Sequence, residues 1–352
     1  MDIQNHFYGH SAILAAAAGQ PRVRHFPGLL QHGWPASSPV ASMFHDFPKV
    51  GTDASKRKLL VWSHESRAWD PAAERHRTIP IGAPFLYLLR LRAGDQTQIP
   101  ERERRPLIAP QHTTVLRGAV GGVEELAGYY RDKFGPSTVC LHGDDLKEPA
   151  TVTAWRAAGH DVVTAGGRFD PRGLSRQLTG LRSASCLVTD RLSTFVFYAL
   201  AAGVPVKIEG ATTLLEGDTS VTMDSLRERW PEVHDPTAPL ALQQEVALRE
   251  LGSRYLLDEA ELATTIGWDH FGAAAASGLD YWALSPFRKA AMVLGITQRT
   301  EFEDNARKVG TDQKRPAEAS SFLKHPLSHL PSRLPELPDM AQPVDWLRPE
   351  DV

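Results

Sequence analysis

The sequence predicts an α/β protein built around a doubly wound parallel sheet, and three observations support this fold class. Short apolar runs, bounded by Gly, Asp or Pro, recur through the middle of the chain. Segments of helical period separate these runs. The chain is 42% apolar and 23% charged, which is typical of a globular protein with one large or two medium domains. Strands that alternate with helices form right-handed crossovers, which build a parallel sheet covered on both faces.

The clearest alternation lies between Arg105 and Gly210. We expect strands over 106–110, 138–142, 161–164, 185–189 and 205–208. We expect helices over 123–134, 150–158, 171–181 and 193–202. This part of the sequence therefore predicts a Rossmann-like domain.

The N-terminal part shows the same alternation less clearly. The patterns predict a helix over 11–18, strands over 28–31 and 59–62, and an apolar strand with a turn over 79–91. Segment 94–105 contains a charge run and has no apolar face, so it is the predicted domain linker.

We therefore expect one domain over 1–100 and a second over 101–310, facing each other across a cleft. In such proteins, ligands bind beyond the carboxyl ends of the parallel strands, where loops from both halves meet.

The C-terminal part changes from helical to proline-rich. Helices are expected over 240–252 and 257–267, the second with Asp258 as its N-cap. Seven prolines then interrupt the tail over 311–352. This tail is either disordered or an extended strap, and both alternatives stay open. The apolar residues that would anchor a strap are Leu330, Leu334, Leu337 and Trp346.

Composition and charge exclude several classes of function. The 39 basic and 42 acidic residues leave a formal charge of −3, without the basic surface that nucleic acids require. Apolar runs such as 12–18 are far shorter than the roughly 20 residues of a membrane-spanning helix, and no standard secretion signal opens the chain. Peripheral membrane association stays open. Cys140 and Cys186 lie in apolar runs and are expected to be buried free thiols, so we expect a cytoplasmic protein.

The first candidate site follows the strand expected over 28–31. His32 stands at the strand end, and Gly33 allows the chain to turn sharply there. An imidazole directed into the cleft can accept a proton from an attacking hydroxyl near neutral pH. Because the chain has 14 histidines, a purely structural role for His32 is an equally good interpretation as a role as proton acceptor.

Two further candidates follow strands of the second half. His112, Thr113 and Thr114 are suited to phosphate oxygens, although the two hydroxyls alone are more typical of local turn bonds. Asp144 and Asp145 follow the strand expected over 138–142, and one of them is expected to cap the next helix or to bind a sugar hydroxyl. A metal site is disfavoured because adjacent side chains on an extended chain point to opposite sides.

The fourth candidate connects the strand expected over 185–189 to the following helix. Exposed backbone N–H groups at the start of a helix, together with hydroxyl side chains, favour an anion. The residues proposed for this anion site are Asp190, Arg191, Ser193 and Thr194, with Glu209 after the next strand as a partner for a ribose or a base edge.

Three motifs in order give the chain a resemblance to a known class of enzymes. They are Gln31–Trp34, Ile108–Thr114 and Thr189–Thr194, and the segment from Trp155 to Asp170 adds a fourth likeness. In these residues the chain resembles two-domain GT-B glycosyltransferases, specifically the bacterial capsular polysaccharide and polysialic acid transferases and the teichoic acid polyglycerolphosphate transferases.

This resemblance implies a GT-B-like fold and a division of roles. The second domain would bind the nucleotide-activated donor through His112, Arg168, Ser193 and Thr194, and His32 would be the general base. Asp144 and Asp145 are secondary candidates for the base.

Gly33 and Trp34 would lie on the acceptor side, near a carbohydrate or small-molecule acceptor. The families that the chain resembles commonly use a CMP- or CDP-linked donor. The sequence has no Asp-x-Asp pair, which favours inverting, metal-independent transfer without a cofactor.

Two alternatives stay open. The first is an enzyme similar to the nucleotide-sugar 2-epimerases, which share this fold but need several carboxylates that converge on the sugar. The second is a non-catalytic protein that binds a nucleotide sugar, which the short N-terminal half favours.

Overall fold

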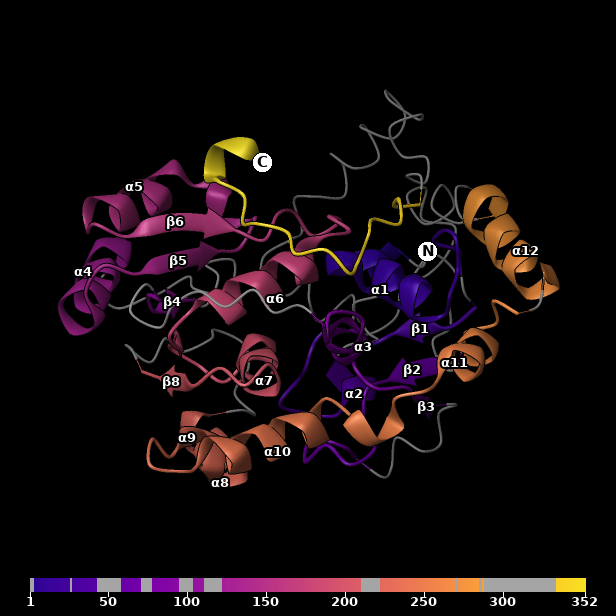
Figure 1. The fold of residues 1–352 in the computed structure, drawn as a ribbon, viewed down its shortest axis with the longest axis horizontal. Coiled ribbons are helices and arrows are strands. Elements are labelled where there is room, and N and C mark those ends of the chain that lie inside the picture. Colours follow the sequence, from indigo (N-terminus) through magenta and orange to yellow (C-terminus); the bar gives the residue numbers. More distant parts are fainter. Residues whose placement is uncertain are drawn as a thin grey trace.

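The protein is an α/β protein with two parallel sheets, as predicted (Figure 1). The computed structural model describes residues 3–25, 27–42, 58–70, 78–94, 104–110, 122–209, 222–269, 271–284, 287 and 334–352.

The first sheet has three parallel strands in the order β1-β2-β3. They are β1 (Leu29–Leu30), β2 (Leu59–Val61) and β3 (Thr78–Pro80). Their neighbouring helices are η1 (Ile3–Gly9), α1 (His10–Ala17), α2 (Pro39–Ser42) and α3 (Pro84–Leu91). Helix α1 and all three strands confirm the sequence prediction. Helix α3 was not predicted, because its sequence PFLYLLRL is apolar almost throughout and its first five residues are buried.

The second sheet has five parallel strands in the order β6-β5-β4-β7-β8. They are β4 (Leu107–Ile108), β5 (Thr138–Leu141), β6 (Asp161–Thr164), β7 (Leu187–Thr189) and β8 (Val206–Ile208). Counted within this half, the strand order is the 3-2-1-4-5 order of a Rossmann-like sheet. The order reverses between β4 and β7, so ligands are expected beyond the carboxyl ends of these two strands.

All four helices predicted for the second half are present. They are α4 (Gly122–Phe134), α5 (Pro149–Ala157), α6 (Gly173–Ser183) and α7 (Thr194–Ala201). Helices α6 and α7 lie between the second sheet and the N-terminal half (Figure 1). There the ring of Phe85 from α3 stacks on Tyr198 from α7, with centroids 4.1 Å apart. One hydrophobic core therefore runs through both halves.

Beyond residue 222 the chain first packs beside β8 of the second half and then returns to the N-terminal half (Figure 1). It forms α8 (Met223–Arg229), α9 (Pro231–His234), α10 (Leu240–Glu250), η7 (Ser253–Tyr255), α11 (Glu259–Thr265), α12 (Phe271–Leu279) and η8 (Asp280–Leu284). Asp258 caps α11 in a capping box with Glu261, which confirms the predicted cap. The amide of Ala83 donates to the carbonyl of Leu251 at 2.8 Å, so the end of α10 lies against the first half.

Residues 334–352 form a strap across α6 and β6, ending in η10 (Pro349–Asp351) (Figure 1). Met340 is buried, and Leu337 and Trp346 pack against the core. The strap alternative therefore holds for this part of the tail. The strap anchor expected at Leu330 and most of the linker expected over 94–105 lie outside the described residues.

Two predictions from composition can be compared with the described residues. Both cysteines are free; Cys186 is buried and Cys140 partly so. Among the helices that the structure describes, none combines the length and the apolar character needed to cross a bilayer.

Candidate functional site

His32 lies two residues beyond β1, at the junction of the two halves. Its ring meets the ring of Phe7 edge to face, with centroids 5.4 Å apart. Burial lowers the pKa of His32 to about 4, and the nearby positive charge of Arg168 acts in the same direction. The imidazole is therefore neutral at physiological pH, and this low pKa makes it a weaker proton acceptor than an ordinary histidine.

The segment after His32 binds directly to helix α7 of the second half. The amide of Trp34 donates to the hydroxyl of Thr194, the first residue of α7, at 2.8 Å. The carbonyl of Gly33 accepts a hydrogen bond from the side chain of Gln31 at 2.8 Å. The side chain of Trp34, expected on the acceptor side, is only 6% exposed and packs in the core against Phe197.

The amino end of α7 has the features of an anion site. β7 ends at Thr189, and Ser193 is the N-cap residue with extended backbone angles but without a side-chain cap hydrogen bond. The first N–H groups of a helix are left without intrahelical partners, and they attract negative charge. Ser193, Thr194 and Arg191 are half-buried, whereas Asp190 is buried.

Tyr8 holds a strained backbone conformation beside the same junction. Its φ of 54° and ψ of 15° lie in the left-handed region, which an aromatic residue rarely adopts. The amide of Tyr8 donates to the carbonyl of Arg168 in the second half at 2.7 Å. Such strain costs about 1–3 kcal/mol and is concentrated at functional sites.

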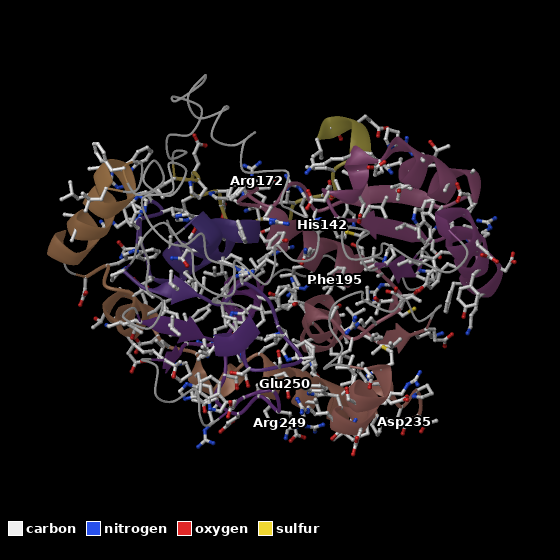
Figure 2. All side chains as sticks on the ribbon, turned by 180° about the vertical axis from the view of Figure 1, so that it is seen from behind. His142, Arg172, Phe195, Asp235, Arg249 and Glu250 are labelled. Atoms are coloured by element: carbon white, nitrogen blue, oxygen red, sulfur yellow. The ribbon has the colours of Figure 1, made fainter. Side chains whose placement is uncertain are left out.

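The hydroxyl of Tyr8 meets His142, which follows β5. Nδ1 of His142 lies 3.2 Å from the amide of Asp144 and 3.5 Å from its carboxylate. Nε2 of the same ring shares a hydrogen bond of 3.2 Å with the Tyr8 hydroxyl. Figure 2 shows His142 near the centre of the molecule, above Phe195 of α7. The structure thus brings His142 to the junction where His32 and α7 meet.

Asp144 forms ion pairs that limit its use as a base. Its carboxylate accepts from Arg168 at 3.2 Å and from Lys147. The hydrogen bond from Lys147 is the main cause that lowers the pKa of Asp144 below its usual value. A carboxylate held in this way is a weak proton acceptor. Asp145 is 2% exposed and begins the short helix η6 (Asp145–Lys147).

Arg168 connects these groups to an aromatic surface. Its guanidinium lies 5.3 Å from the ring centroid of Phe7. The ring of Phe169 lies 5.3 Å from that of Phe7, and Phe169 is 53% exposed. Phe7 is buried, so only Phe169 offers an exposed ring beside the arginine, which is suited to bind a ring that carries a phosphate.

The remaining predicted residues are placed differently or lie outside the described part. Glu209, at the end of β8, forms an ion pair with Lys133, and its carbonyl accepts from Tyr130 at 2.7 Å. His112, Thr113 and Thr114 lie outside the described residues. In the described ranges, no cluster of three or more His, Cys, Asp or Glu side chains could hold a metal ion.

Sequence reasoning missed Phe7, Tyr8 and Phe169. Phe7 and Tyr8 precede the first expected helix and follow no strand, so no motif marks them. Phe169 lies inside the segment from Trp155 to Asp170 that contributes to the resemblance, but no role was predicted for its side chain.

Comparisons with known proteins give weak likenesses. No family profile and no curated protein matches the sequence. Among solved structures, the chain is similar to Os79 from O. sativa in complex with UDP, at 16% identity and a TM-score of 0.34 over 62% of this chain and 55% of that one. It is also similar to a mutant of the O-GlcNAc transferase of Thermobaculum terrenum, at 15% identity and a TM-score of 0.30 over 62% of this chain and 45% of that one. The chain thus spans about half the length of both proteins.

Proposed function

We propose that the protein is a glycosyltransferase that moves a sugar, or a related polyol phosphate, from a nucleotide-activated donor to an acceptor hydroxyl. The observation that carries this proposal is the hydrogen bond from the Trp34 amide to the Thr194 hydroxyl. This bond joins the turn that carries His32 to the amino end of α7. A neutral imidazole and a helix N-terminus therefore lie at one junction, as transfer from a phosphate leaving group requires.

With a sugar donor, the acceptor oxygen forms a bond to the anomeric carbon while the bond from that carbon to the donor phosphate oxygen breaks. With a polyol phosphate donor, the acceptor oxygen forms a bond to phosphorus while the phosphoanhydride bond to the nucleotide breaks. His32 takes the proton of the acceptor hydroxyl. The leaving phosphate keeps the electron pair, and its charge is stabilised by the N–H groups of α7, by Ser193 and by Arg168. A single displacement of this kind inverts the anomeric configuration.

Finer features of the proposal come from the sequence. The motifs around His32, His112 and Ser193 resemble those of the capsular polysaccharide and teichoic acid transferases, and this resemblance favours a cytidine nucleotide as donor. The sequence has no Asp-x-Asp pair, which favours chemistry without a metal. One feature comes from the structure instead: the exposed ring of Phe169 is proposed to stack on the acceptor.

The proposal is tested by incubating the protein with CMP-, CDP-, UDP- and GDP-sugars and candidate acceptors, followed by mass spectrometry of the products. We expect transfer or slow donor hydrolysis, unaffected by EDTA. An epimerised sugar, or binding without turnover, would refute the proposed reaction.

The role of His32 is tested by the substitution His32→Asn. Because the base is lost but the donor site is retained, kcat should fall about 10²- to 10⁴-fold with little change in donor KM. The matched control is His234→Asn, since the pKa of His234 on α9 is also lowered to about 4. A fall in donor affinity with unchanged kcat would make His32 a binding residue instead.

The wild-type rate should persist below pH 6, because His32 is protonated only near its pKa of about 4.

A further inference from the structure

A cavity lies at the edge of the second sheet opposite to the candidate site. Its volume is about 560 Å³, within the range of roughly 300–1,000 Å³ that is typical of small-molecule sites. One wall consists of Leu107, Thr138 and Asp161, which are the first residues of β4, β5 and β6. Because the strands are parallel, this cavity lies at their amino ends, away from the carboxyl ends where the candidate site is built.

The opposite wall of the cavity is the strap. Trp346 lies on Gly180 of α6 so closely that a Cβ atom at Gly180 would be 2.0 Å from Cζ2 of the indole. Leu347 exchanges two backbone hydrogen bonds with Thr164 of β6, at 3.0 and 3.1 Å. The amide of Val344 donates to the hydroxyl of Thr179 at 3.2 Å. These contacts fix the indole as a partly exposed wall of the cavity.

The charges around the cavity cancel. Arg105 and Arg348 face it together with Asp161 and Asp345, so the formal charge of the lining is zero. Arg348 is bound to Asp161 in an ion pair. A lining with balanced charge gives no preference for a strongly anionic or cationic ligand, which disfavours a second nucleotide site.

We propose that this cavity binds a neutral oligosaccharide. The indole of Trp346 offers an apolar face to one side of a sugar ring, and the exposed groups of Arg105 and Asp345 donate to and accept from its hydroxyls. The cavity would hold a carbohydrate chain at a place separate from the transfer site. This binding does not depend on the proposed transferase reaction.

The proposal is tested by saturation-transfer NMR and calorimetry on the full chain with maltotriose, cellotriose and chitotriose. We expect at least one of them to bind. The substitutions Arg105→Ala and Asp345→Ala should each weaken that binding by about tenfold or more, because each removes a charge-assisted hydrogen bond. Both residues are exposed and lie outside helices and strands, so the fold should persist.

The matched controls are Arg227→Ala and Asp224→Ala, which change an exposed ion pair on α8. Both controls should bind as the wild type does. The proposal is overturned if none of the three sugars binds, if the cavity variants bind equally well, or if inorganic phosphate displaces the sugar. His32→Asn should bind the sugar normally, so a failure of the transferase proposal and a failure of this one give different results.

Discussion

Glu250 connects the two halves through buried hydrogen bonds. It is 1% exposed and is the last residue of helix α10. Its carboxylate accepts from the indoles of Trp34 and Trp230 at 3.0 and 2.9 Å. It also accepts from the hydroxyl of Ser66 at 2.6 Å and from the amide of Arg67 at 3.0 Å. A buried carboxylate with four donors is fully satisfied, and its removal leaves those donors unpaired.

The substitution Glu250→Ala should therefore lower the free energy of unfolding by about 3–5 kcal/mol. Urea denaturation followed by fluorescence measures this change. The control is Glu245→Ala, a position on the same helix, which should change stability by less than about 0.5 kcal/mol. A loss below about 1 kcal/mol for Glu250→Ala would show that the indoles find other acceptors.

At this scale, sequence reasoning identified groups that follow strands and missed groups whose place depends on tertiary packing. His32, Asp144 and Arg168 lie at one junction, and each follows a predicted strand. Tyr8 reaches the same junction only because its left-handed backbone turns it toward Arg168. Glu250 looks like an ordinary helix-surface glutamate in sequence, since nothing local shows the two indoles that surround it.

At the scale of elements, the short apolar runs predicted every described strand. Most of these strands are largely buried between helices, whereas β3 and β8 are only partly buried. Helix α3 was missed because Arg90 is the only charged residue in its short apolar sequence PFLYLLRL, and a short apolar run does not distinguish a helix from a strand. Whether the tail is disordered or forms a strap could not be decided from the sequence. Its prolines exclude a helix or an inner strand, whereas the groove that receives Trp346 is formed by residues distant in sequence.

Two glycines inside helices should respond to alanine in opposite ways. Gly180→Ala should displace Trp346, lower the melting temperature and make the strap sensitive to limited proteolysis. At Gly128 of α4, no atom of the described residues, apart from the adjacent residues and the helix's own backbone, lies within 4 Å of the position that an added Cβ would take. Gly128→Ala should therefore stabilise by about 1 kcal/mol through helix propensity alone. Equal effects of the two substitutions would contradict the close packing of the strap.

At the scale of the whole molecule, the shared core predicts that the two halves unfold together. Side chains from α1, α3, α6, α7 and α10 belong to one cluster.

Several histidines are buried in this molecule as neutral groups. Burial lowers the pKa of His6 and His10 to about 3 in the folded state.

These pKa shifts make the protein sensitive to acid. The unfolded chain binds protons at these imidazoles below about pH 6.5, whereas the folded protein does not, so stability falls as pH decreases from there toward 3. Each buried imidazole should cost about 2 kcal/mol between pH 7 and 5. Urea midpoints across this range measure the loss, and His10→Gln should reduce the slope by about one proton. A flat profile would show that these histidines are already protonated when folded.

The strap has a consequence beyond the cavity that it encloses. β6 is the outermost strand on one side of the second sheet, and an outer strand offers unpaired backbone groups to other molecules. Leu347 takes both hydrogen bonds of Thr164, and the ion pair between Arg348 and Asp161 lies at the start of the same strand. Residues 334–352 thus cover this edge and prevent it from pairing with a strand of another molecule. A chain that is cut before residue 334 should therefore self-associate.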